Sequence, residues 1–204
     1  MFSIPGYNHR LMARFAYRFP LLYDALGPLI NIQSLWQLVA VLAVPQPGVR
    51  VLDACCGTGH LALLLHSRLN GGGEVVGLDH SPYMLGRANN EGKASLTFVR
   101  GDAEHIPYPD GHFDRATLTL ALHEMPAEAR GRVLAELKRV TKKRVVLGEL
   151  YPPKGWWNRF ALSLVEELQW VNEMRGLAEQ VIVAGFRIEG QEFWGAFQTL
   201  QAEV

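Results

Sequence analysis

The sequence is poor in cysteine and has no excess of either charge. Only two of its 204 residues are cysteines, the adjacent Cys55 and Cys56. Adjacent thiols do not supply the spaced pairs of a disulfide framework or a zinc knuckle, so we expect a reducing, cytoplasmic setting and no metal site. The chain has 20 lysines and arginines against 20 aspartates and glutamates. Binding to duplex nucleic acid needs an uncompensated basic face, so no nucleic-acid partner is expected.

Long apolar runs and internal repeats are also absent. The most apolar stretch away from the N-terminus, from Leu35 to Val44, is too short to span a bilayer. The first twenty residues lack the apolar core and cleavage site of a signal peptide, so we expect the mature chain to begin at Met1. With 49% hydrophobic residues and this length, residues 1–204 are predicted to form a single domain.

Short aliphatic runs alternate with segments of helical periodicity. Strands are predicted at residues 49–54, 74–79, 96–101, 113–120, 144–150, 186–193 and 196–203. Helices are predicted at residues 32–43, 59–69, 82–90 and 126–139. Alternation of this kind predicts an α/β fold with a mostly parallel sheet and helices on both faces. The last two strands are joined by Trp194-Gly195 with no room for a helix, so they should pair as an antiparallel hairpin.

Two further helical segments flank this core. Residues 151–180 begin with a Pro-Pro pair and carry apolar side chains at helical spacing, namely Trp157, Phe160, Leu164, Leu168 and Val171. They predict an amphipathic helix, which either packs on the sheet or forms a lid over a ligand. Residues 1–45 are expected to form a helical cap. Its arginines Arg10, Arg14 and Arg18 form a basic stripe, interpreted either as a solvated helix face or as a peripheral contact with an anionic membrane.

The most informative segment is VLDACCGTGHLALLL, in which a buried strand runs through Gly57-Thr58-Gly59 into a helix. Glycine allows a tight turn and a close approach of the backbone to a ligand, and the helix start adds oriented N–H donors. Together with Asp79 at the end of the next strand, this loop also suits a dinucleotide site. An NAD(P)-binding reductase is therefore one candidate.

Three carboxylates favour a different ligand. Asp53, Asp79 and Asp102 lie at the carboxyl ends of the first three strands, the edge where open α/β sheets bind ligands. Asp53 would repel a pyrophosphate but suits a cationic amino acid, and Asp79 can accept from ribose hydroxyls. The chain after Leu150 is also too short for the second, substrate-binding domain of a typical nicotinamide enzyme.

These segments together resemble the class I S-adenosylmethionine-dependent methyltransferases. VLDACCGTGHLA is similar to the first motif of that family, VVGLDHSPYML to its second-strand motif, and GDAEHIPYPDGHFDRATLTLALHEMP to its third- and fourth-strand block. The resemblance implies a Rossmann-like seven-stranded methyltransferase fold, with a cofactor-binding core at 49–150, a lid at 151–180 and a closing β-hairpin at 186–203. YDALGPLI is similar, loosely, to the ubiquinone/menaquinone C-methyltransferases.

The resemblance implies S-adenosylmethionine as cofactor and S-adenosylhomocysteine as product. Gly57 and Gly59 would line the methionine part of the cofactor, with Asp53 near its amino group. Asp79 would hold the ribose. The alternative for Asp79 is a cap on the helix that begins near Pro82.

The adenine site is implied in the same way. His80 and Met84 would flank the ring, and Asp102 with the Ala103 backbone would face its amino edge. Met84 has the alternative of an ordinary core position. The remaining cofactor contacts that the resemblance implies are Cys55, Gly101 and Leu120. Cys55 stands where the family often has glycine and is interpreted as a small packed hydrophobe.

The acceptor side is predicted from His123, which follows the fourth strand, and from Tyr23 in the N-terminal cap. His123 is interpreted as a base or an orienting group, with a structural histidine as the alternative. Tyr23 would close over the methyl group, or else be an ordinary amphipathic tyrosine. We expect methyl transfer to a small, apolar or lipid-like acceptor such as a quinone or phenol. A non-catalytic S-adenosylmethionine-binding protein of the same fold is a further candidate.

Overall fold

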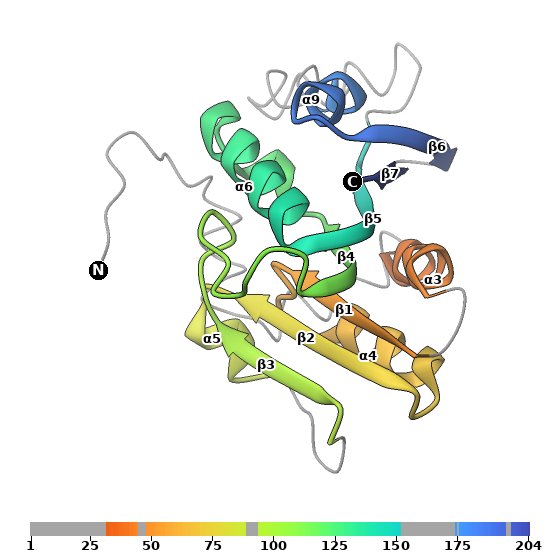
Figure 1. Ribbon diagram of the computed structural model, residues 1–204, viewed down its shortest axis with the longest axis vertical. Helices are drawn as coiled ribbons and strands as arrows, with labels where there is room; N and C mark the ends of the chain where they lie inside the picture. Colours follow the sequence, from red (N-terminus) through yellow and green to blue (C-terminus); the bar gives the residue numbers. More distant parts are fainter. Residues whose placement is uncertain (1–31, 45–47, 89–93, 152–173, 175, 195–196) are drawn as a thin grey trace, which may run out of the picture.

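The computed structural model describes residues 32–44, 48–88, 94–151, 174, 176–194 and 197–204. Its centre is a seven-stranded sheet in the order β3-β2-β1-β4-β5-β7-β6 (Figure 1). The strands are β1 Val49–Ala54, β2 Gly73–Asp79, β3 Leu96–Arg100, β4 Phe113–Thr119, β5 Thr141–Leu150, β6 Arg187–Trp194 and β7 Phe197–Glu203. Strands β1 to β5 are parallel, whereas β7 runs antiparallel to both β5 and β6. The predicted parallel sheet and closing hairpin are confirmed.

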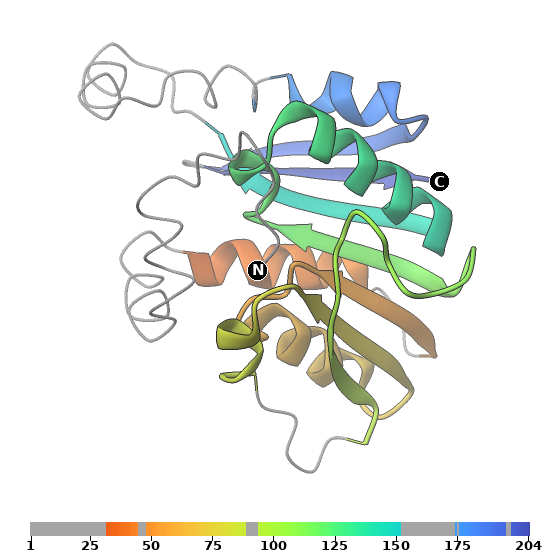
Figure 2. The same cartoon turned by 90° about the vertical axis from the view of Figure 1, so that its left-hand side faces the viewer.

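Helices cover both faces of the sheet. They are α3 Ile32–Ala43, α4 His60–Leu69, α5 Pro82–Leu85, α6 Ala127–Val140 and α9 Leu177–Val183, with a 3-10 turn, η2, at Leu122–Glu124. Figure 2 shows α6 and α9 in front of the sheet and α3 behind it. Two buried clusters match these layers, because one contains side chains of α6 and α9 and the other side chains of α3 and α4. Adjacent strand residues such as Val51 and Leu52 belong to opposite clusters, as the alternation of a strand requires.

Most element ends lie within one residue of the prediction, and three elements differ more. Helix α5 ends at Leu85 rather than at residue 90, because Gly86 and Arg87 form a turn at its end. Strand β5 begins at Thr141, where α6 runs into it without a loop. Helix α9 only overlaps the end of the helical segment predicted at 151–180 and continues to Val183, and its Leu177 and Val181 are fully buried in the core.

Several expectations fall outside the described residues. These are the cap at residues 1–31 with Tyr23 and the basic stripe, the amphipathic segment 157–171, and the Gly195 of the hairpin turn. Within the part of the chain that the structure describes, no helix is long and apolar enough to cross a membrane.

Candidate functional site

The candidate site lies at the carboxyl edge of β1 and β4. These neighbours form the switch point of the sheet, because the chain leaves β1 through α4 toward β2 and leaves β4 through α6 toward β5. Open α/β sheets bind ligands at such a point. The loops that meet there are residues 55–59 after β1 and residues 120–124 after β4.

Both loops hold a non-glycine residue in the left-handed region of the backbone. Cys55 has φ 57° and Leu120 has φ 53°. Such a conformation costs about 1–2 kcal/mol for a residue with a Cβ, and strain of this kind clusters at functional sites. Glycine adopts a positive φ without this cost, which explains why glycine suits the position of Cys55.

The two glycines of the first loop face different surroundings. A Cβ on Gly59 would lie 2.6 Å from the Cζ atom of Phe98, whereas a Cβ on Gly57 would meet nothing within 4 Å. Gly59 is therefore required by packing within the protein. Gly57 has a positive φ and an open side, which leaves its backbone accessible to a ligand.

Asp79 ties this loop to the end of β2. Its buried carboxylate accepts hydrogen bonds from the Gly57 N–H and the Ser81 N–H, both at 2.8 Å. Ser81, and not Asp79, caps α5, because the Ser81 hydroxyl accepts from the Met84 N–H at 3.3 Å. Each carboxylate oxygen of Asp79 keeps a second lone pair that can accept from a hydroxyl group.

Asp53 is a buried carboxylate with one unused oxygen. It is 1% exposed, and its Oδ1 accepts from the Thr117 hydroxyl at 2.8 Å. Among the residues that the structure describes, Oδ2 has no hydrogen-bond partner. Burial raises the pKa of Asp53 to about 7 and the nearby charge of Asp79 adds to the rise, whereas the Thr117 hydroxyl and, more weakly, the backbone N–H of Ala62 oppose it. An ammonium ligand at Oδ2 would supply both the missing donors and the opposite charge.

The residues expected around an adenine ring differ in how exposed they are. Asp102 is exposed, with Oδ1 accepting from the Glu104 N–H at 2.9 Å, and Ala103 beside it is buried. His80 is largely exposed, whereas Met84 is 3% exposed, which favours a packed position for its side chain. Gly101 is partly buried at the end of β3, where its N–H donates to the Asp79 carbonyl.

The adjacent thiols of Cys55 and Cys56 are expected to be unreactive. Burial, followed by the charges of Asp53 and Asp79, raises the pKa of both thiols. Cys55 also packs against the larger core cluster. A thiol that stays protonated is a poor nucleophile.

We therefore expect both cysteines to react at least about tenfold more slowly with a disulfide reagent in the folded protein at pH 8 than in denaturant. Ellman titration of folded and unfolded protein measures this ratio. Equal rates would contradict the assignment of Cys55 as a packed hydrophobe.

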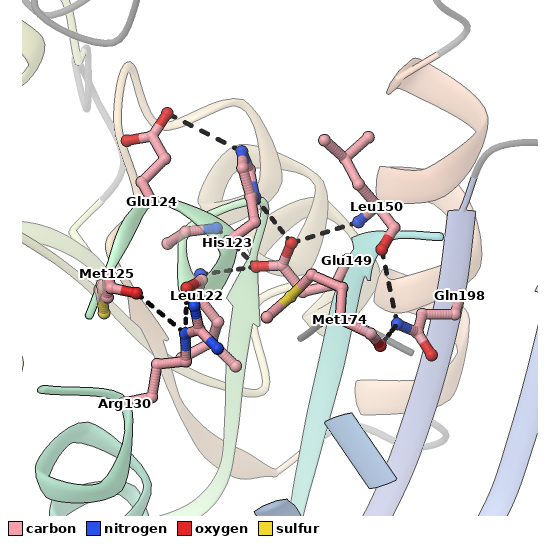
Figure 3. A network of polar contacts seen from close by, with 10 residues as sticks. Leu122, His123, Glu124, Met125, Arg130, Glu149, Leu150, Met174 and Gln198 are labelled. Carbon is pink, nitrogen blue, oxygen red and sulfur yellow. Dashed lines mark hydrogen bonds and ion pairs between the residues drawn. The ribbon is translucent and has the colours of Figure 1, made fainter. Parts of the chain in front are cut away.

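The loop after β4 is organised by a buried carboxylate that the sequence analysis missed. Glu149 lies at the end of β5 and points toward the loop that carries His123 (Figure 3). It has no exposed surface. Its Oε1 accepts from the N–H groups of Ala121 and Leu122 at 2.8 and 2.6 Å, and its Oε2 lies 2.8 Å from Nδ1 of His123. The available signal was a lone acid in the otherwise apolar run VVLGEL.

His123 lies against this carboxylate and is 14% exposed. Its Nε2 lies 3.9 Å from a carboxylate oxygen of Glu124. The loop is also held from α6, since the buried Arg130 donates from Nε to the carbonyls of Leu122 and Met125, each at 2.9 Å. His123 is thus held in a loop that is fixed on two sides (Figure 3).

Known proteins share this architecture. A family model described as a methyltransferase domain matches residues 51–144. An uncharacterized methyltransferase of Synechocystis sp. is 32% identical over 203 residues, which cover 93% of this chain and 94% of that protein. The 2-phytyl-1,4-naphtoquinone methyltransferase of Synechococcus elongatus is 40% identical over 129 residues, 59% of this chain. The match spans only about half of that relative, 54% of its length.

A solved structure agrees with these sequence matches. The crystal structure of a SAM dependent methyltransferase from Aquifex aeolicus superposes with a TM-score of 0.65 at 21% identity, covering 88% of this chain and 93% of that one. The fold is therefore shared nearly end to end. With a methyltransferase relative matched over almost its whole length, the chain belongs to the class I S-adenosylmethionine-dependent methyltransferase family.

Proposed function

We propose that this protein transfers a methyl group from S-adenosylmethionine to the reduced, quinol form of a quinone-like small molecule. The observation that carries the cofactor assignment is the buried Asp53 oxygen without a partner, beside a glycine loop at the switch point. The acceptor class is supported by the relative named as a naphtoquinone methyltransferase. The family membership favours this function over an NAD(P)-dependent reductase.

The cofactor would be held by the edge of β1 and β2. Asp53 would bind the amino group of the methionine part. The rest of the methionine part would run along the backbone of Gly57 and Gly59. Asp79, already fixed by two backbone N–H groups, would accept from the ribose hydroxyls. The adenine would lie toward the edge of β3, with its contacts drawn from His80, Met84, Gly101, Asp102 and Ala103. When bound, S-adenosylmethionine supplies an electrophilic methyl group on a positively charged sulfur.

The acceptor would approach the loop after β4, which contains the strained Leu120 and His123. An electrophilic methyl group needs a nucleophilic acceptor, and the electron-rich quinol is nucleophilic whereas the electron-poor oxidised quinone is electrophilic. A quinol becomes a stronger nucleophile as its hydroxyl proton leaves. His123 would take that proton, as a base within reach of the site. Tyr23, in the N-terminal segment, is proposed to close over the methyl group that is transferred.

The first test is calorimetric titration with S-adenosylmethionine and S-adenosylhomocysteine, using NAD as the competing candidate. We expect binding of the two sulfur compounds and none of NAD. Asp79→Asn should weaken binding at least tenfold, which corresponds to about 1.4 kcal/mol. Asp110→Asn is the matched control, because Asp110 pairs with Arg139 on an exposed loop away from the site.

The second step is turnover on a naphthoquinol with a short isoprenoid chain, followed by mass spectrometry for the added methyl group. Folded protein that binds no S-adenosylhomocysteine would overturn the proposal. Cofactor binding without methylation of quinols or phenols would support a non-catalytic binding protein instead.

A further inference from the structure

We infer that Glu149 is a positioning residue that fixes the tautomer of His123, so that the lone pair of the neutral imidazole lies on Nε2. The inference rests on the proposed function in one respect, because it assigns His123 the role of base. The juxtaposition itself is independent of that role, since it comes from a contact between the turn η2, which follows β4, and the end of the neighbouring strand β5.

The contacts of Glu149 define which atom donates. Its carboxylate meets three backbone N–H groups, those of Ala121, Leu122 and its own neighbour Leu150, the last at 3.2 Å (Figure 3). A backbone N–H can only donate, so these three contacts require both carboxylate oxygens as acceptors. The fourth contact, 2.8 Å from Nδ1 of His123, is satisfied when Nδ1 carries the proton. A neutral imidazole with its proton on Nδ1 has its basic lone pair on Nε2.

The burial of Glu149 gives this arrangement its effect. A carboxylate without exposed surface is screened little by water, so its charge acts strongly on a ring 2.8 Å away. It stabilises the positively charged ring that forms when Nε2 takes a proton. The Glu149 side chain comes from β5, and its carboxylate holds the loop that carries His123 by accepting from two backbone N–H groups of that loop. Glu124, by contrast, lies 3.9 Å from Nε2, which is too far to fix a tautomer by hydrogen bonding.

Glu149→Gln separates positioning from loop anchoring. The glutamine carbonyl can still accept from Ala121 and Leu122, so the loop keeps its anchor. The amide nitrogen that replaces Oε2 can only donate, and His123 must then accept at Nδ1 and carry its proton on Nε2. The amide also faces the Leu150 N–H donor to donor, which costs some stability. The variant therefore reverses the tautomer with little change of shape.

The experiment is long-range 1H–15N correlation of the histidine rings in the full-length protein at pH about 8.5, where an ordinary imidazole is neutral. His123→Gln identifies the signals of His123 by their loss. We expect the proton on Nδ1 in the wild type and in the control Glu124→Gln, and on Nε2 in Glu149→Gln. This result needs no methyl acceptor, so it stands or falls separately from the proposed function.

Kinetics provide the second measurement, where a quinol is turned over. Glu149→Gln should lower kcat by about 10²–10⁴ while the affinity for S-adenosylhomocysteine stays within about twofold of the wild type. An unchanged Nδ1–H tautomer in Glu149→Gln would overturn the inference. So would a parallel loss of cofactor affinity and thermal stability, because that pattern marks a purely structural carboxylate.

Discussion

Replacement of Asp53 with asparagine is expected to stabilise the ligand-free protein above pH 7 and at the same time to weaken its binding of S-adenosylmethionine. Asp53 is buried and one of its oxygens lacks a partner, so its charged form is costly in the folded state. Asparagine is neutral and of nearly the same shape. It still offers a carbonyl oxygen to the Thr117 hydroxyl, but its amide nitrogen takes the place of Oδ2 and finds no acceptor among the described residues, which offsets part of the gain by about 1–3 kcal/mol.

The sign of the pH dependence follows from the pKa. Burial raises the pKa of Asp53 from 3.8 to about 7, so between these values the folded state holds a proton that the unfolded state has released. The contribution of Asp53 to the free energy of unfolding is therefore most favourable at low pH, and this contribution is lost as the pH rises to about 7. A difference of about three in pKa corresponds to about 4 kcal/mol as an upper bound. After the cost of the unpaired amide, we expect Asp53→Asn to recover about 1–3 kcal/mol at pH 8.5 and about none at pH 5.

Urea unfolding of the wild type and Asp53→Asn at the two pH values measures this gain. The control is Asp102→Asn, which removes an exposed carboxylate from the same edge of the sheet and should leave stability unchanged. Equal stability of the wild type and Asp53→Asn at pH 8.5 would show that the Asp53 carboxylate is not destabilising.

Whereas the stability of the ligand-free protein falls as the pH rises, its affinity for S-adenosylmethionine should increase. An amino group binds the ionised form of Asp53, so binding near pH 6.5 should release a proton and should strengthen as pH rises through 7. Calorimetry in two buffers of different ionisation enthalpy counts that proton. Asp53→Asn should bind at least tenfold more weakly and without this proton release. Retained affinity in the variant would place the amino group elsewhere.

The sheet was predictable because its signal is local. The run Val49–Ala54 and the helix Ile32–Ala43 have the predicted bounds, since each is marked by its own pattern of apolar residues. The position of Asp79 follows in the same way, because it ends a predicted strand at the edge where parallel strands meet. Helix Leu177–Val183 lacks such a signal, because its seven residues are too few to establish a helical period.

The contact between His123 and Glu149 depends on information that is not local. The two residues are 26 positions apart and meet because β4 pairs with β5 in a register that sets Thr119 opposite Gly148. A shift of one residue would turn Glu149 to the other face of the sheet. Likewise, neither cysteine nor leucine favours a positive φ, so the strain at Cys55 and Leu120 is imposed by the surrounding structure.

A pair of glycine variants should separate folding from cofactor binding. In Gly59→Ala, the new Cβ lies 2.6 Å from Cζ of Phe98 on a backbone with φ 83°, so we expect a loss of about 2–4 kcal/mol of stability. In Gly57→Ala, the backbone has φ 55° but the Cβ meets no protein atom within 4 Å. The expected loss is then only about 1–2 kcal/mol.

The two variants should rank in the reverse order for ligand affinity per folded molecule. The Cβ of Gly57→Ala would stand on the open side of the loop, where the methionine part of the cofactor is proposed to lie, so affinity for S-adenosylhomocysteine should fall at least tenfold. Gly59→Ala, in contrast, should regain stability when Phe98→Leu removes the ring that it meets. Calorimetry at a temperature where both are folded decides the order. A Cβ at Gly57 meets no protein atom within 4 Å, so a bound ligand is what it would disturb. If Gly57→Ala binds S-adenosylhomocysteine as tightly as the wild type, the cofactor does not pass over this glycine.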